Sequence, residues 1–160
     1  MVKRIFTVIL FFSVLLTIAS CDKNDFFGHA ELRIALDSDF REFKSDNFDA
    51  AYTDGTAVVG IYRISYNAGF NQGIPDFLTP AQFAAFYMER AEIESEVKDY
   101  RGTAYYEYTR LDGELKNSYI ASFYRSKYAY FIVLFATPEK LYPDIAGELL
   151  SYTETVIFVY

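Results

Sequence analysis

The chain has 160 residues, enough for one domain with a sizeable core and too few for two domains of ordinary size. Aromatic residues make up 19% of it, with 15 Tyr, 16 Phe and no Trp, a composition that suits pleated sheets better than helical bundles. The net charge of −7 becomes −9 without residues 1–20, because removing Lys3 and Arg4 leaves 13 basic residues against 22 acidic ones. Such a charge repels phosphate backbones, so nucleic acid is excluded as an expected partner.

Residues 1–20 have the pattern of a secretory signal peptide. Lys3 and Arg4 precede an apolar segment over residues 5–18. At 1.5 Å per residue, a helix of this length is shorter than the roughly 30 Å hydrocarbon core of a bilayer. A permanent membrane span is therefore the weaker interpretation.

The residues that end this segment, Ile18-Ala19-Ser20-Cys21, resemble the lipobox of bacterial lipoproteins. The resemblance implies cleavage before Cys21, acylation of its sulfur and amino group, and a membrane-anchored place in the bacterial cell envelope, facing outside the cytoplasm. Several acyl chains on one residue meet the requirement for stable anchoring, and the lipid bilayer becomes one expected partner. Residues 21–29 then form the lipidated cysteine and a short polar tether. Ordinary secretion with a free Cys21 thiol and an uncleaved anchor are the alternatives, and the single cysteine excludes an internal disulfide.

Residues 30–160 are expected to form a single domain that begins with short strands. Residues 31–36 alternate apolar and polar side chains, which predicts a half-buried strand. Residues 48–52 and 57–65 flank Asp54-Gly55, a strong hairpin signal. Residues 66–78 contain Gly and Pro without periodicity, which predicts a long loop.

A helix is predicted from Pro80 to Glu94. Thr79 is placed as its N-cap, with Pro80 at the first helical position and Gln82 completing a capping box. The apolar side chains share one face, and Arg90 interrupts that face. Either Arg90 lays its stem along the sheet and pairs with Glu94, or it binds a ligand.

The aromatic centre of the sequence is a three-strand meander over residues 104–111, 119–125 and 128–136. A second helix over residues 142–152 and a closing strand over residues 155–160 follow. Together these patterns predict an α+β fold with an antiparallel sheet of about six strands and helices packed against it.

This order of elements resembles the PsbP-like fold, shared by a photosystem II subunit, a Ran-binding import factor and many bacterial lipoproteins. Local similarities are Leu36-Asp37-Ser38-Asp39-Phe40, Thr79-Pro80-Ala81-Gln82-Phe83 and the strand from Tyr130 to Phe135. Members often have proline where Asp37 stands. The resemblance implies action by surface docking, and it carries over no functional residue.

Catalytic chemistry has little support in the sequence. His29 is the only histidine, so histidine-based triads and zinc catalysis lack their side chains, and no cofactor, metal or catalytic residue is predicted. No phosphate-cradling glycine motif is present. Paired carboxylates such as Asp37 with Asp39, or Glu107 with Glu114, remain the basis of an alternative hypothesis, a hydrolase of cell-wall or environmental glycans.

The tyrosines and their neighbouring arginines favour a binding surface, although ordinary sheet packing explains most of them. We therefore predict a non-enzymatic, membrane-tethered accessory module that binds an envelope protein or a glycan through a sheet edge, an aromatic face or the 66–78 loop. The candidate binding residues are Arg90, Tyr100, Arg101, Tyr124 and Arg125.

Overall fold

The structure, a computed structural model, describes residues 26–28 and 31–160. The predicted signal peptide and the predicted lipidated Cys21 lie outside the described residues. Within them, no helix is both long and apolar enough to cross a membrane.

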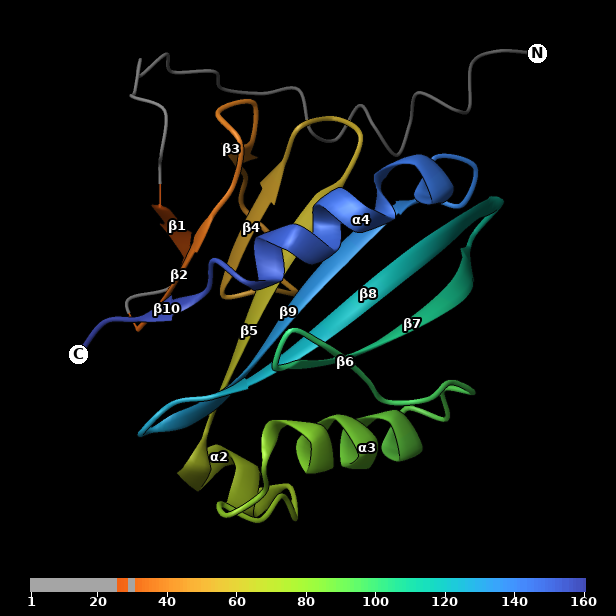
Figure 1. Ribbon diagram of the computed structural model, residues 1–160. Coiled ribbons are helices and arrows are strands. Elements are labelled where there is room, and N and C mark those ends of the chain that lie inside the picture. The colour runs from red at the N-terminus through yellow and green to blue at the C-terminus, as the bar shows by residue number, and fades with distance from the viewer. Residues whose placement is uncertain (1–25, 29–30) are drawn as a thin grey trace.

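A long antiparallel sheet forms the centre of the described chain (Figure 1). Its strands, in spatial order, are β3 (Arg41–Glu42), β4 (Ala50–Thr53), β5 (Val58–Ser65), β9 (Ala129–Pro138), β8 (Leu115–Arg125), β7 (Thr103–Asp112) and β6 (Lys98–Tyr100). Every neighbouring pair is antiparallel. The expected α+β class with an antiparallel sheet is confirmed, with seven strands here rather than about six.

The predicted aromatic meander is the β7–β8–β9 unit. Gly113, with φ of 68°, supplies the left-handed position that the Asp112–Leu115 hairpin turn requires. The register then sets Tyr108 opposite Tyr119 and Tyr119 opposite Ala136. Because alternate residues of a strand point to opposite faces, the meander supplies large side chains to both sides of the sheet.

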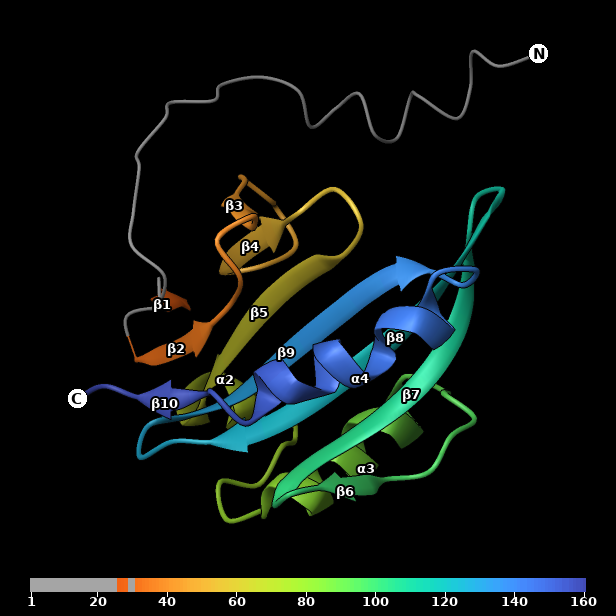
Figure 2. The same cartoon turned by 45° about the horizontal axis from the view of Figure 1, so that its top comes forward.

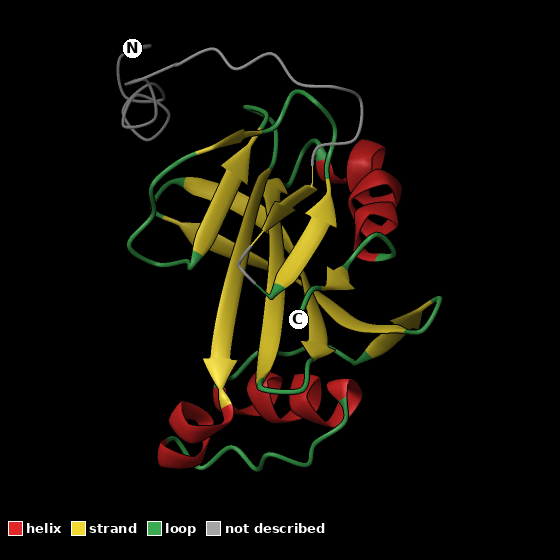
Figure 3. Ribbon diagram, turned by 90° about the vertical axis from the view of Figure 1, so that its left-hand side faces the viewer, coloured by secondary structure: helices red, strands yellow, loops and turns green. Residues whose placement is uncertain are grey.

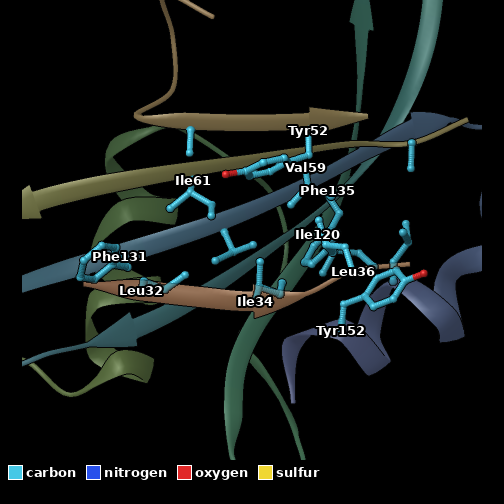
Figure 4. Packing of buried hydrophobic residues seen from close by; sticks show 14 of the residues in the cluster. Leu32, Ile34, Leu36, Tyr52, Val59, Ile61, Ile120, Phe131, Phe135 and Tyr152 are labelled. Atoms are coloured by element: carbon cyan, nitrogen blue, oxygen red, sulfur yellow. The ribbon is translucent and has the colours of Figure 1, made fainter. Parts of the chain in front are cut away.

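One face of the long sheet carries a helix and a second, smaller sheet, and we call it the α4 face. The helix α4 (Tyr142–Thr153) lies across β8 and β9, as Figure 2 shows. Beside it is a three-stranded sheet in the order β1 (Phe26–Gly28), β2 (Leu32–Ala35), β10 (Ile157–Phe158), seen next to the long sheet in Figure 3. Together they bury an apolar core that includes Leu32, Ile34, Ile61, Ile120, Phe131, Phe135 and Tyr152 (Figure 4).

The other face, which we call the α3 face, carries α2 (Tyr66–Asn71) and α3 (Pro80–Arg90). The predicted capping box is confirmed: the Thr79 hydroxyl accepts from the Gln82 N–H at 3.2 Å, and the Gln82 side chain accepts from the Thr79 N–H at 2.9 Å. Phe83 anchors the helix, fully buried, with its ring 4.3 Å from that of Tyr130 and edge-on to Phe123.

Three local expectations need correction. The predicted loop over 66–78 is wrong in its first part, where the Ser65 hydroxyl accepts from the Ala68 N–H and starts α2. The predicted tether over 21–29 contains β1, whose backbone pairs with β2. The predicted closing strand pairs with β2 and so joins the small sheet rather than the long one.

The helix α3 also ends earlier than expected, at Arg90 rather than Glu94. Glu92 has φ of 53°, and the N–H groups of Glu92 and Ile93 donate to the carbonyls of Glu89 and Met88. These two bonds form a Schellman motif, which usually has glycine at the left-handed position. The sequence has no glycine at this position to signal the end of the helix. The prediction relied on periodicity alone and therefore made the helix about one turn too long.

Candidate functional site

A groove of about 910 Å³ opens on the α3 face beyond the C-terminal end of α3. Its floor comes from β5, β7, β8 and β9, and its walls come from the end of α3, the segment after it and the turn before β4. The lining residues are Asn47, Phe48, Tyr62, Tyr87, Ala91, Glu92, Ile93, Glu94, Tyr106, Tyr108, Thr109, Arg110, Tyr119, Ala121, Ile132 and Leu134. Five of these sixteen residues are tyrosines, so we call it the tyrosine groove.

The groove exists because α3 is shorter than the strands that it covers. Its eleven residues reach about 16 Å at 1.5 Å per residue. The strands β7 and β8 have 10 and 11 residues, and at about 3.4 Å each they reach about 34 to 37 Å. The Schellman motif at Glu92 then turns the chain away. Apolar rings that a longer helix would bury therefore form the floor of a groove.

Strand pairing arranges the rings of the floor. Tyr108 and Tyr119 are cross-strand neighbours, and their rings stack at 4.8 Å with planes 10° apart. Tyr106 follows on the same side of β7, with its ring 5.9 Å from that of Tyr108. Such contacts fix ring positions without help from a ligand.

The wall opposite α3 depends on a glycine. The Phe48 ring lies against the Tyr62 ring, with centroids 4.7 Å apart and planes tilted by 55°. A Cβ atom on Gly60 would come within 2.2 Å of the Phe48 ring, so Gly60 provides the space that the ring occupies. Gly60 is therefore a positioning residue for this aromatic wall.

Four tyrosine hydroxyls of the groove make no hydrogen bond to any described residue: those of Tyr62, Tyr87, Tyr106 and Tyr108. The hydroxyl of Tyr119, in contrast, donates to the carboxylate of Asp112. Burial is the main cause that raises the pKa of Tyr62, Tyr106 and Tyr108, and the Tyr87 phenol adds to it in all three. The pKa of Tyr108 rises to about 12. The phenols of Tyr62, Tyr106 and Tyr108 are thus neutral at physiological pH and able to donate and accept hydrogen bonds. Tyr106 is only 1% exposed, whereas Tyr62, Tyr87 and Tyr108 are half-buried.

The charged residues of the groove lie at its rim and are mainly acidic. Glu92 and Glu94 are exposed on the segment after α3. Arg110 is the lining cation, and its guanidinium lies 3.7 Å from the carboxylate of Asp112. Among the described residues, no cluster of His, Cys, Asp and Glu side chains could hold a metal ion.

Three of the residues predicted to bind a ligand lie together on the α4 face, away from the groove. Tyr124 donates its hydroxyl to the Thr153 carbonyl at 3.1 Å. Arg101 pairs with Glu154 at 3.0 Å and lies over the Tyr100 ring. These contacts tie the β6–β7 turn to the end of α4.

The other two predicted residues hold the segment between α2 and α3. Arg90 donates to the Gln72 carbonyl, and Arg125 donates to the Asp76 carbonyl at 2.9 Å. Arg90 is exposed at the end of α3 with its guanidinium over the Phe86 ring, rather than in the middle of an apolar face beside Glu94. The five predicted residues therefore do not form one surface.

The segment between α2 and α3 carries a second, smaller hollow of about 500 Å³. Phe70 and Phe77 stand at its edge with exposed fractions of 79% and 71%. It coincides with the 66–78 segment that the sequence suggested for docking. Its lining carries fewer polar groups than that of the tyrosine groove.

The carboxylate pairs of the hydrolase hypothesis are not assembled in the groove. Glu107 lies on the α4 face, bonded to Lys98 at 2.7 Å and to the Tyr142 hydroxyl. Glu114 lies in the hairpin turn beyond Asp112. Asp112 is five residues past Glu107, so Glu114 lies more than about 17 Å from Glu107 along β7. Glycosidase carboxylates stand about 5 to 9.5 Å apart. Asp37 and Asp39 are exposed in the turn after β2, outside the groove.

Sequence reasoning singled out Tyr106, Tyr108 and Tyr119 only as members of the aromatic meander. It missed Phe48, Tyr62 and Tyr87 as parts of the same site, because they come from a turn, another strand and a helix. The available signal was the short capped helix beside long aromatic strands.

No family model and no curated protein matches this chain. Among solved structures, it is similar to a protein from Bacteroides thetaiotaomicron, known from a crystal structure at 1.50 Å resolution, with a TM-score of 0.57 and 12% identity. That match covers 81% of this chain and 45% of the other, so this chain spans less than half the length of that protein. It is also similar to cyanobacterial PsbP from Synechocystis, known from a solution structure, with a TM-score of 0.46, 12% identity and coverage of 89% and 99%. The first likeness concerns the fold alone, and no functional residue is transferred from either protein.

Proposed function

We propose that this protein is a non-enzymatic binding module whose ligand enters the tyrosine groove. The observation that carries the proposal is the set of three half-buried, unpaired tyrosine hydroxyls, of Tyr62, Tyr87 and Tyr108, in a preformed groove of about 910 Å³. Pockets for small molecules commonly measure about 300 to 1,000 Å³ and combine apolar walls with a few convergent polar groups. The stacked rings of Tyr108 and Tyr119, and the space that Gly60 leaves for the Phe48 ring, hold the lining of the groove in place before any ligand binds.

The proposed location is the bacterial cell envelope, with the module held on the outer side of a membrane by acylated Cys21. The support is the lipobox sequence Ile18-Ala19-Ser20-Cys21. The strand β1 begins at Phe26, so at most five residue steps, about 17 Å, separate the lipidated residue from the folded body. This short reach would keep the folded body close to the bilayer and within range of envelope proteins and glycans.

The glycan hydrolase is the second candidate, and the groove offers it less support. Its lining carboxylates, Glu92 and Glu94, are both exposed at the rim. A general acid for glycoside cleavage usually acquires its raised pKa through burial. The buried part of the groove contains phenols instead of carboxyls.

A tryptophan reporter tests whether the groove binds anything. The chain has no Trp, so the variant Tyr87→Trp carries a single indole in the groove wall. We expect its emission in the purified full chain to shift on titration with neutral oligosaccharides, quaternary ammonium ions, small aromatic compounds or peptides. Tyr100→Trp, on the opposite face, is the matched control and should not respond. A response confined to Tyr100→Trp, or none in either variant, contradicts the proposal.

Cys21→Ser tests the proposed membrane location. If the sulfur carries lipid, the variant should leave the membrane fraction and keep its leader, which gel mobility and cell fractionation report. A variant that matures normally and stays with the membranes would falsify the lipoprotein assignment.

A further inference from the structure

The tyrosine groove presents hydroxyls and ring faces side by side, and this combination points to one class of ligand. Tyr62, Tyr87, Tyr106 and Tyr108 come from three elements, β5, α3 and β7, yet all four line the same groove. We infer that the tyrosine groove binds a neutral oligosaccharide. The inference rests on the proposed function, because it names the ligand class of the same groove.

The hydroxyls supply the polar half of the recognition. A sugar ring carries hydroxyls that both donate and accept hydrogen bonds, and a neutral phenol does the same. The half-buried phenols of Tyr62, Tyr87 and Tyr108 have no described partner to give up, so a ligand would gain these bonds without breaking internal ones. Tyr106 is only 1% exposed and serves mainly as part of the floor beneath them. The Tyr119 hydroxyl is already committed to Asp112 and contributes mainly its ring.

The rings supply the apolar half. Sugar rings also have faces of C–H groups, which bury their apolar area against flat aromatic side chains. Phe48 with Tyr62 forms one wall, and the stacked pair of Tyr108 and Tyr119 forms part of the floor. At about 910 Å³, near the upper end of the usual range for small-molecule pockets, the groove has room for more than one sugar ring.

The charges argue against an anionic ligand. Glu92 and Glu94 lie at the rim, and Arg110 lies near the carboxylate of Asp112. An anion would meet repulsion from the rim and from the chain as a whole, whose net charge is −7. Uronic acids and phosphorylated glycans are therefore disfavoured.

The ring geometry argues against a cation cage. Such a cage surrounds the ammonium group with several open ring faces. Tyr108 and Tyr119 stack nearly parallel, so one face of each ring is covered by the other. The unpaired hydroxyls would also find no partner in a quaternary ammonium ion.

Calorimetry on the full chain tests the inference. The probes are neutral hexasaccharides of glucose with α-1,4, β-1,4 and β-1,3 linkages and of N-acetylglucosamine, with hexagalacturonate and tetramethylammonium as the charged probes. We expect at least one neutral hexasaccharide to bind and both charged probes to fail. Tyr62→Phe and Tyr108→Phe keep the rings and remove one hydroxyl each, so each should weaken binding roughly three- to ten-fold. Tyr128→Phe, an exposed tyrosine outside the groove, should leave affinity unchanged.

The outcomes separate this inference from the proposed function. Binding of tetramethylammonium or hexagalacturonate, with none of the neutral sugars, overturns the saccharide assignment and leaves a groove that binds. Sugar binding that both Phe variants leave intact also overturns it, because the hydroxyls would then play no part. If the emission of Tyr87→Trp does not shift with any class of probe, the proposed function itself is overturned.

Discussion

The two faces of the long sheet carry similar aromatic strands but are covered to different extents. On the α4 face, a helix and a three-stranded sheet enclose Phe131, Phe135 and Tyr152 in a closed core. On the α3 face, two short helices cover Phe83, Phe123 and Tyr130 but leave Tyr62, Tyr108 and Tyr119 half-buried. The same side-chain chemistry thus builds a core where the covering layer is long enough and a groove where it stops. The length of the covering element, rather than the composition of the strand, decides which one forms.

The largest expected effect is the loss of a ring from the closed face. Phe135 is fully buried, so Phe135→Ala should lower the free energy of unfolding by about 3 to 5 kcal/mol. Tyr119→Ala, on the groove side of β8, should lower the free energy of unfolding clearly less, because the Tyr119 ring is only half-buried and less apolar area is lost. Urea denaturation compares the two. Equal losses would mean that the α3 face is packed as tightly as the α4 face.

The next largest effect concerns Gly60, which leaves the space that the Phe48 ring occupies. Gly60→Ala places a methyl group against the Phe48 ring and should destabilise the fold by about 1 to 3 kcal/mol. The double variant Gly60→Ala/Phe48→Ala should lose no more stability than Phe48→Ala alone, since the clash is then absent. Thermal unfolding of the four proteins completes the cycle. Additive losses would show that the two residues act independently.

Two tyrosine hydroxyls of the α3 face, one hydrogen-bonded and one unpaired, should contribute differently to stability. The buried Tyr130 hydroxyl accepts from the Leu78 N–H and donates to the Pro75 carbonyl, both at 2.8 Å. Tyr130→Phe should therefore cost about 1 to 2 kcal/mol. Tyr108→Phe removes a hydroxyl without a described partner and should stay within about 0.5 kcal/mol of the parent. The reverse order of the two losses, measured by denaturant unfolding, would contradict the assignment of the groove hydroxyls.

The smallest effect concerns pH and an ion pair on the α4 face. Burial raises the pKa of Glu107, but hydrogen bonds from Lys98 and Tyr142 and the charge of Lys98 outweigh it, so the net pKa falls below its ordinary value. A lowered carboxyl pKa stabilises the fold above the unfolded pKa of about 4.5, and this contribution is lost as the pH falls through the folded value. Glu107→Gln should cost about 1 kcal/mol at pH 7, since the pair is partly exposed, and progressively less below about pH 4. Denaturation at pH 7 and pH 3.5 measures the gap, which should narrow rather than widen.

Much of the fold follows from local patterns. The Asp54-Gly55 hairpin, the Thr79 cap and the three-strand meander each depend on residues near in sequence, and each is confirmed. The short strands β1, β3 and β6 were not expected, because two- or three-residue strands are defined by the partner they pair with.

The candidate site was harder to predict, for the same reason. An arginine beside a tyrosine suggests binding, yet Arg101 and Arg125 find structural partners far along the chain, in Glu154 and Asp76. The groove in turn joins Phe48, Tyr62 and Tyr108 from separate elements. No local spacing links them.

By itself, the sequence determined the class of fold and the aromatic strands, since periodicity and turn residues act over a few neighbouring positions. The lipobox-like motif, equally local, supports a proposed location. Only the tertiary structure decided which tyrosines became core and which became groove. That choice depends on where α3 ends relative to the strands beneath it, and the end is set by a left-handed Glu92 that the sequence does not mark.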